Sequence, residues 1–195
     1  GKLNYISVPI IKRSQNQLIN QAAISYSENW TLGHRNKLKE SLAGAPYANE
    51  AMEIFDQVVS CKSSKLIEIN KICFKKLANY LGVLRNQIIY DSTEIQTCNK
   101  TNSNRLLEIC LQLEAKVYLT GHGALNYLNH ELFERNGIEV HYIKYQFSSY
   151  ERKNCDYNPY VSALDPIAHL GKNTKKSMRS KTVYWRDAIK NPSDL

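Results

Sequence analysis

The chain has 195 residues, 43% of them hydrophobic and 23% charged, which is enough for one core that buries about 70% of the unfolded surface. No apolar run approaches the ~20 residues that span a bilayer, and no charged-then-apolar leader precedes Leu3, so we expect a cytoplasmic protein without a membrane span. The five cysteines include no Cys-x-x-Cys pair, which argues against disulfides and a zinc site. The five histidines do not have the spacing of metal ligands. The sequence has no nucleotide-binding motif, so we expect no cofactor.

The first half of the chain alternates between strand and helix patterns. Alternate apolar residues over Leu3–Ile11 predict a strand, which Pro9 places at the edge of a sheet. A polar surface excursion over Lys12–Tyr26 follows. Three helices come next, because apolar residues recur at helical spacing; they are expected at about His34–Leu42, Ala48–Val59 and Lys65–Leu81. Residues 83–90 have a strand pattern, and residues 91–104 are a polar loop.

Residues 105–142 carry an unbroken sequence of alternating elements. The pattern predicts a helix after the capping candidates Ser103 and Asn104, a strand at Lys116–Thr120, a helix at Ala124–Arg135 and a strand at residues 138–142. Gly137 marks the end of the second helix. This order favours parallel strands joined by right-handed crossovers.

The predicted fold is therefore α/β. We expect a small mixed, largely parallel sheet with βα crossover units and a helical layer from about residue 30 to 81. After Gly171 the composition becomes strongly basic. We expect a single domain over residues 1–171 and a basic, partly helical extension over residues 172–195.

Several segments resemble the WbqC-like family of bacterial proteins. They include Val117-Tyr-Leu-Thr-Gly-His-Gly-Ala-Leu-Asn-Tyr-Leu128, Tyr5-Ile-Ser-Val-Pro9, Ala45-Pro-Tyr47 and Tyr160-Val-Ser-Ala-Leu-Asp165. Family members usually begin with a further stretch that carries Gln-Pro and Trp-x-Asn-Arg elements. We therefore expect this chain to correspond to the C-terminal three-quarters of such a protein.

The resemblance implies a role in O-antigen or other surface-polysaccharide biosynthesis. The chemistry that it suggests is transfer of an acyl or aminoacyl group to the nitrogen of a sugar or sugar nucleotide. The partners implied are that sugar substrate and an acyl or aminoacyl donor.

The turn Gly121-His122-Gly123 follows a predicted strand, where ligands settle in open α/β sheets. His122 could act there as a general base, while Gly121 and Gly123 would let the backbone approach a ligand. Tyr127 is placed with them as a substrate-binding residue. The alternative is that the glycines only make a tight turn and that His122 is solvated.

Trp30 and His34 are four residues apart, so they share a face if the helix extends back to Trp30. The indole could stack on a sugar or base while the imidazole bonds a hydroxyl or phosphate, as substrate-binding and catalytic groups. The alternative is an ordinary buried aromatic beside a structural histidine at a helix start.

Ser162 and Asp165 occur at a spacing typical of the family, just before a predicted helix. Asp165 could orient a substrate hydroxyl or a catalytic base, with Ser162 binding substrate; the alternative is a capping pair. The family's usual His-Pro-x-Tyr-x-Gln ahead of this motif stands here as Phe147-Ser-Ser-Tyr150-Glu-Arg152.

A net charge of +8 leaves other classes of function open. The basic C-terminal segment, with Tyr184 and Trp185, could bind RNA, or it could only solubilise the protein. The charge is equally consistent with a nucleotide-linked sugar or an aminoacyl-tRNA donor. A non-catalytic partner in a glycan-assembly complex is the remaining alternative.

Overall fold

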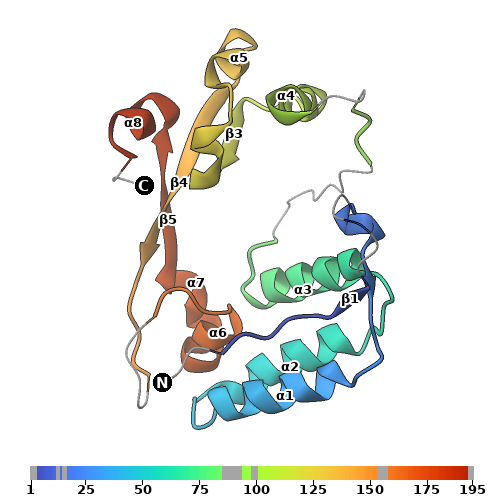
Figure 1. Ribbon diagram of the computed structural model, residues 1–195. Coiled ribbons are helices and arrows are strands. Elements are labelled where there is room, and N and C mark those ends of the chain that lie inside the picture. The colour runs from blue at the N-terminus through green and yellow to red at the C-terminus, as the bar shows by residue number, and fades with distance from the viewer. Residues whose placement is uncertain are drawn as a thin grey trace. The chain divides into compact units, whose positions relative to one another are not determined.

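The computed structural model describes residues 4–11, 14, 17–84, 94–97, 101–152 and 158–192. The chain divides into two compact units (Figure 1). Unit 1 comprises Gly1–Arg85 and Ser148–Ser177, and unit 2 comprises Asn86–Phe147 and Met178–Leu195. Among the described residues, no helix combines the length and the apolar character needed to cross a membrane. The expected boundary at Gly171 between a domain and an extension stays a prediction.

The expected helical layer is confirmed in unit 1. It consists of α1 (Trp30–Ser41), α2 (Ala48–Val59) and α3 (Leu66–Tyr80). The helix α1 begins four residues before the predicted start, because the Asn29 side chain accepts a hydrogen bond from the Leu32 amide and caps the helix there. At the end of α3, Gly82 takes a positive φ of 63°, as the sequence indicated for a helix stop.

A second group of short helices packs on α2. It contains α6 (Leu164–Leu170), the 3-10 turn η3 (Gly171–Asn173) and α7 (Thr174–Ser177). Their shared core consists of Leu42, Ala51, Ile54, Ile167 and Ala168. Gly171 has a φ of 55°, and a Cβ there would lie 3.0 Å from the Tyr47 ring, so both backbone and packing require glycine.

The N-terminal segment of unit 1 contains less strand than expected. A strand is predicted over Leu3–Ile11, but within the described residues 4–11 the paired part is β1 (Ile10–Ile11), antiparallel to β2 (Ala23–Ile24). The 3-10 turn η1 (Ile19–Gln21) lies between them. The expected surface excursion also contributes to the interior, because Ile24 is buried against α2 and α3 residues. The strand expected at residues 83–90 lies almost wholly outside the described residues.

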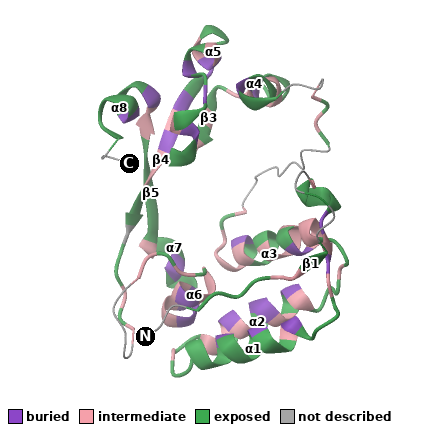
Figure 2. Ribbon diagram, in the orientation of Figure 1, coloured by how far each residue is buried: buried purple, intermediate pink, exposed green. Residues whose placement is uncertain are grey.

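Unit 2 is built on a three-stranded mixed sheet. Its elements are α4 (Asn102–Gln112), β3 (Val117–Thr120), the 3-10 turn η2 (His122–Asn126), α5 (His130–Arg135), β4 (Glu139–Phe147), β5 (Met178–Tyr184) and α8 (Trp185–Lys190). The strand order is β3-β4-β5, with β3 parallel and β5 antiparallel to β4. The buried residues of this unit gather along β4 and on α5 (Figure 2). The α/β fold with a small mixed sheet is confirmed.

The single helix predicted over Ala124–Arg135 is wrong, because the chain breaks it into η2 and α5. The Asn129 side chain accepts from the Leu132 amide and starts a new helix. Ser103 holds the break in place, since its hydroxyl accepts from the Asn129 amide at 2.9 Å and contacts the Tyr127 carbonyl at 3.4 Å. Ser103 therefore ties α4 to this break, while Thr101 stands at the N-cap of α4.

The basic C-terminal segment contains a strand that its sequence did not suggest. The strand β5 pairs with β4 over seven residue pairs, from His141 opposite Tyr184 to Phe147 opposite Met178. The helix α8 then begins at Trp185, whose side chain is buried in the core of unit 2.

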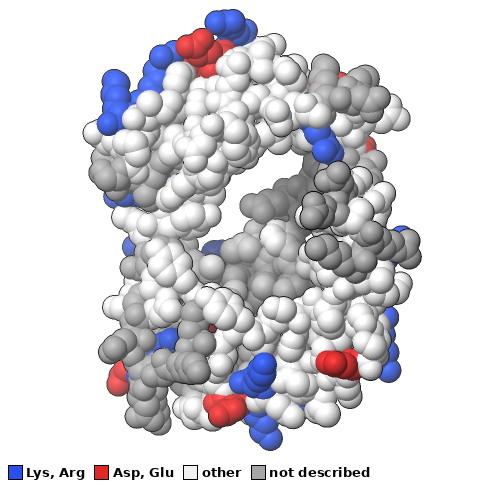
Figure 3. Space-filling model, in the orientation of Figure 1, with Lys and Arg blue, Asp and Glu red and all other residues white. Residues whose placement is uncertain are grey.

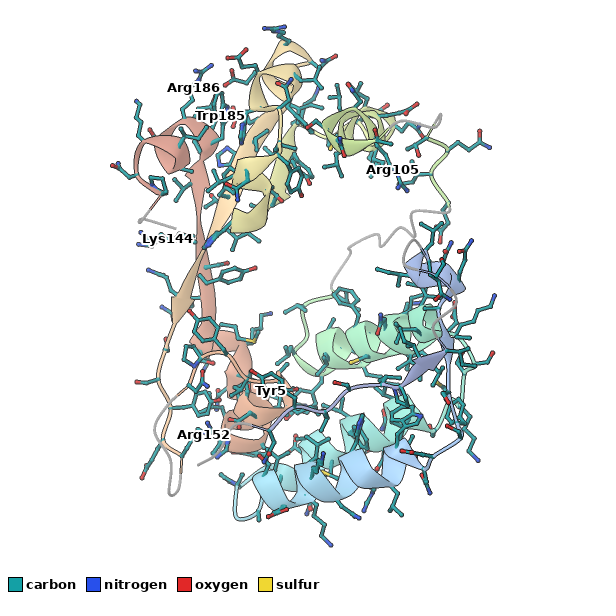
Figure 4. The ribbon with its side chains drawn as sticks, viewed as in Figure 1. Tyr5, Arg105, Lys144, Arg152, Trp185 and Arg186 are labelled. Carbon is teal, nitrogen blue, oxygen red and sulfur yellow. The ribbon has the colours of Figure 1, made fainter. Side chains whose placement is uncertain are left out.

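One carboxylate fastens α8 to α5. Glu134 accepts hydrogen bonds from Tyr184, from the Trp185 indole at 2.9 Å and from Arg186 at 2.6 Å. The Arg186 guanidinium also lies 4.4 Å from the Trp185 ring centre, and Figure 4 labels both residues in the α8 region. The His130 ring stacks on the Trp185 ring, with the ring centres 4.7 Å apart. The Tyr184 and Arg186 hydrogen bonds lower the pKa of Glu134 from 4.5 to about 2.

This pKa predicts an acid-sensitive contribution to stability. A carboxyl whose pKa is depressed by folding stabilises the folded state above its ordinary pKa, and that contribution is lost as the pH falls from about 4.5 toward about 2. We expect the free energy of unfolding, measured in urea, to decline more steeply in this window for the native chain than for Glu134→Gln. The control Glu131→Gln, on the exposed side of the same helix, should follow the native chain. Equal slopes for all three proteins would contradict the assignment.

Candidate functional site

Asp165 is a buried carboxylate in unit 1. It lies in the first turn of α6 and is 6% exposed. Its Oδ1 accepts a hydrogen bond from the Tyr150 hydroxyl at 2.7 Å, and its Oδ2 lies 2.8 Å from Nη2 of Arg152. A buried carboxylate needs such partners, because an unpaired charge away from water is costly. The carboxylate therefore joins the segment after β4 to α6 and does not cap the helix.

His169 lies one helical turn after Asp165. Its Nδ1 is 2.9 Å from the main-chain oxygen of Asp165 and 3.5 Å from the carboxylate Oδ1. Both neighbours only accept hydrogen bonds, so Nδ1 carries the proton. In the neutral ring Nε2 then holds a lone pair, and no hydrogen bond to Nε2 is found among the described residues. The His169 side chain is 13% exposed, and its ring lies 5.5 Å from the Tyr150 ring.

Arg152 completes the cluster from the loop after β4. Its side chain is 14% exposed, and its Nε is buried without a hydrogen-bond partner among the described residues. Figure 4 shows Arg152 beside the α6 region of unit 1. A guanidinium with a remaining donor can hold both Asp165 and a further oxygen.

Ser162 makes local hydrogen bonds just before α6, whose N-cap residue is Ala163. Its hydroxyl accepts from the Leu164 amide at 3.3 Å, and its carbonyl accepts from the Asp165 amide at 2.9 Å. Ser162 thus shapes the start of α6, while Asp165 makes contacts outside its own helix.

Trp30 and His34 share a face of α1, as their spacing indicated, with ring centres 5.1 Å apart. Both are buried, and Trp30 packs in the cluster of Ile24, Val58 and Ile69. Burial lowers the pKa of His34, opposed in part by a hydrogen bond to the Ser7 backbone. The other end of α1, at Leu42, is the end that contacts α6 residues. The described contacts therefore do not join this pair to Asp165.

The Gly121-His122-Gly123 turn lies in unit 2. His122 is exposed, and its Nε2 donates to the Ile143 carbonyl of β4 at 2.8 Å, just beyond the last residue paired with β3. Neither glycine has a positive φ, and a Cβ on either would meet nothing within 4 Å. The turn opens a five-residue 3-10 helix, not the long α-helix that was expected, so little helix dipole is directed at it. Tyr127 is 60% exposed.

The predicted site residues thus fall into both units. Trp30, His34, Ser162 and Asp165 belong to unit 1, whereas the turn and Tyr127 belong to unit 2. Among the described residues, no group of three or more His, Cys, Asp or Glu side chains is placed to hold a metal ion.

Comparison with known proteins identifies the family. The family model of WbqC-like proteins matches residues 1–177. The chain belongs to the WbqC-like protein family. It is similar to the uncharacterized protein Rv1507c of Mycobacterium tuberculosis, with 24% identity over 183 residues that cover 91% of this chain and 76% of that protein. No solved structure matches the chain significantly.

Three residues around Asp165 were not selected from the sequence, namely Tyr150, Arg152 and His169. Tyr150 and Arg152 stand where the WbqC-like pattern noted above has Tyr and Gln, and the structure shows that both bond Asp165. His169 had a signal of its own, because Asp-x-x-x-His within a helix places the two residues on one face.

The ion pair at this site predicts a specific effect on stability. Asp165→Ala leaves the Arg152 guanidinium largely buried without its carboxylate, and removal of one partner of a buried pair typically costs about 3–5 kcal/mol. We therefore expect a loss of that order in the free energy of unfolding, measured by urea denaturation.

The double variant Asp165→Leu with Arg152→Met removes both charges and should recover most of this loss. The control Ser162→Ala, which removes only a local bond, should cost about 1 kcal/mol or less. If the single and double variants lost equal stability, the ion pair would not be what holds the segment after β4 to α6.

Proposed function

We propose that this WbqC-like protein is a transferase of surface-polysaccharide (O-antigen) biosynthesis that moves an acyl or aminoacyl group onto an amino sugar or sugar nucleotide. The observation that carries the proposal is the fixed His169 ring, with Nδ1 bonded to Asp165 and Nε2 without a protein partner among the described residues. This is the arrangement that a general base requires, because the orienting partner sets the tautomer.

The proposed step uses His169 as base and then as acid. The sugar amine attacks the acyl carbonyl carbon, and Nε2 takes the proton that the nitrogen loses as the N–C bond forms. When the bond to the donor's leaving group breaks, the imidazolium returns that proton to the leaving thiol or hydroxyl. Asp165 stabilises the imidazolium, and Tyr150 and Arg152 hold Asp165 in position.

The role of base fits His169 better than the two histidines that the sequence suggested. His34 is buried beside Trp30 and bonds the Ser7 backbone. His122 uses Nε2 to satisfy a strand carbonyl in unit 2. Within the proposal, Gly121, Gly123 and Tyr127 remain candidates for binding the sugar or its nucleotide, and the reaction takes place in the cytoplasm.

Two alternatives stay open beside the transferase. A non-catalytic partner in a glycan-assembly complex would need Asp165 and His169 only for folding. An RNA-binding module would depend on basic residues elsewhere. Variants of His169 separate these classes, because a general base contributes to rate and not to fold.

The test is a transfer assay with defined probes. The protein is incubated with a UDP-linked amino sugar that has a free amine, which is the acceptor. Acetyl-coenzyme A and aminoacyl-tRNA are supplied in separate reactions as alternative donors. The mass of the sugar nucleotide is followed in each reaction. We expect acylation by the native chain and a rate lower by about 10²–10⁴-fold in His169→Gln, the usual contribution of a general base.

The control is His141→Gln, which removes a histidine of unit 2 that bonds Glu139. It should leave the rate within about twofold of the native value, as for a surface substitution away from the site. Full activity of folded His169→Gln would remove His169 as the base. No acylation with either donor would favour the non-catalytic alternative.

A further inference from the structure

The strands β4 and β5 continue past the end of the sheet as a two-stranded ribbon. The strand β3 pairs with β4 only as far as Tyr142, whereas β5 pairs with β4 through Phe147. Residues 143–147 and 178–182 therefore have each other as their only strand partners in the described part of the chain. We call these two segments the β4–β5 ribbon.

One face of the ribbon is basic. Side chains alternate between the two faces of a strand, so every second residue lies on the same face. The face that carries Tyr142 and Val183 in the sheet therefore also carries Lys144, Lys181 and Arg179 in the ribbon. Lys144 and Lys181 are directly opposite each other in the register. Like charges at opposite positions of neighbouring strands repel, so this pair costs stability in the isolated protein.

No acid offsets these charges locally. Residues 140–147 and 178–184 contain neither Asp nor Glu. Among the described residues, no ion pair involves Lys144, Arg179 or Lys181. Arg179 and Lys181 are exposed and Lys144 is half-buried. Figure 3 shows Lys and Arg atoms on the side of unit 2 where α8 and β5 lie, and Figure 4 shows Lys144 on the part of β4 beyond β3.

We propose that the β4–β5 ribbon binds the phosphate backbone of a nucleic acid through Lys144, Arg179 and Lys181. Two of these cations are two residues apart on one strand, about 7 Å along it, and the third lies across from one of them. Such a row of cations suits a chain of regularly repeated phosphates. Binding would also remove the repulsion between the two lysines.

An anionic membrane is a poorer partner for this ribbon. Membrane-surface elements combine cations with apolar side chains that can enter the lipid together. Here the alternation places Ile143, Tyr145 and Met178 on the face opposite to the cations, so one flat surface cannot take both sets. The proposal does not rest on the transferase chemistry, because it concerns a surface of unit 2 and requires none of the residues around Asp165.

The test measures binding of a fluorescently labelled 20-nucleotide RNA and a DNA of the same sequence, by anisotropy over a range of salt concentrations. Backbone recognition predicts similar affinities for both and a linear fall of log K with log salt. The variant Lys144→Gln/Arg179→Gln/Lys181→Gln should bind at least tenfold more weakly. Its salt slope should be lower by about 2, since each phosphate contact on a single strand contributes ~0.7.

The matched control is Lys172→Gln/Lys176→Gln/Lys190→Gln, which removes the same charge from exposed positions outside the ribbon. It should retain most of the affinity and the slope. The ribbon variant should melt at the native temperature or above, because it removes a repulsive pair, so weaker binding would not reflect unfolding. Equal losses in both variants, no binding by the native chain, or binding only to phosphatidylserine vesicles would each overturn the proposal.

Discussion

The arrangement of the candidate site depends on the burial of one carboxylate. Asp165 cannot remain charged away from water without partners, and it obtains them from Tyr150 and Arg152, which precede it by 15 and 13 residues in the sequence. The same contacts fix the segment after β4 against α6. Because α6 is fixed, His169 is held one turn later with a defined proton position. Structural and chemical roles therefore meet in one residue.

Unit 2 uses an acid in a different way. Glu134 gathers three donors from the junction of β5 and α8, and these bonds hold the C-terminal helix on α5. With α8 secured at one end, β5 extends along β4 well past β3, and the basic ribbon results. The two proposed activities thus belong to separate structural features.

Sequence periodicity predicted the regular elements well where one apolar face decides the structure. Helix α2 has the predicted bounds, and β3 and the start of β4 lie where expected. Periodicity missed the break at Tyr127–Asn129, because the deciding interaction is the hydrogen bond that the Asn129 amide donates to Ser103, which is distant in sequence. Periodicity also missed β5, because its charged residues are typical of a solvated tail. The strand forms because it pairs with β4, and the local sequence does not reveal this pairing.

The candidate site was predictable only in part. The sequence indicated Asp165 as an orienting group, and its neighbour His169, the proposed base, had a visible i, i+4 signal. Tyr150 and Arg152 could not be assigned to it, because no local pattern reports which residues a loop brings to a helix. For Gly121 and Gly123, sequence reasoning anticipated a backbone requirement, and the structure shows ordinary φ values with open space around both.

The central claim is that Asp165 holds His169 as a base with its proton on Nδ1. Long-range ¹H–¹⁵N NMR of the histidine rings, at a pH where His169 is neutral, measures this directly. The His169 signals are assigned by their absence from a His169→Gln sample. The account predicts that His169 is protonated at Nδ1 and that Asp165→Asn alters the His169 signals. A neutral ring protonated at Nε2, or signals that Asp165→Asn leaves unchanged, would contradict it.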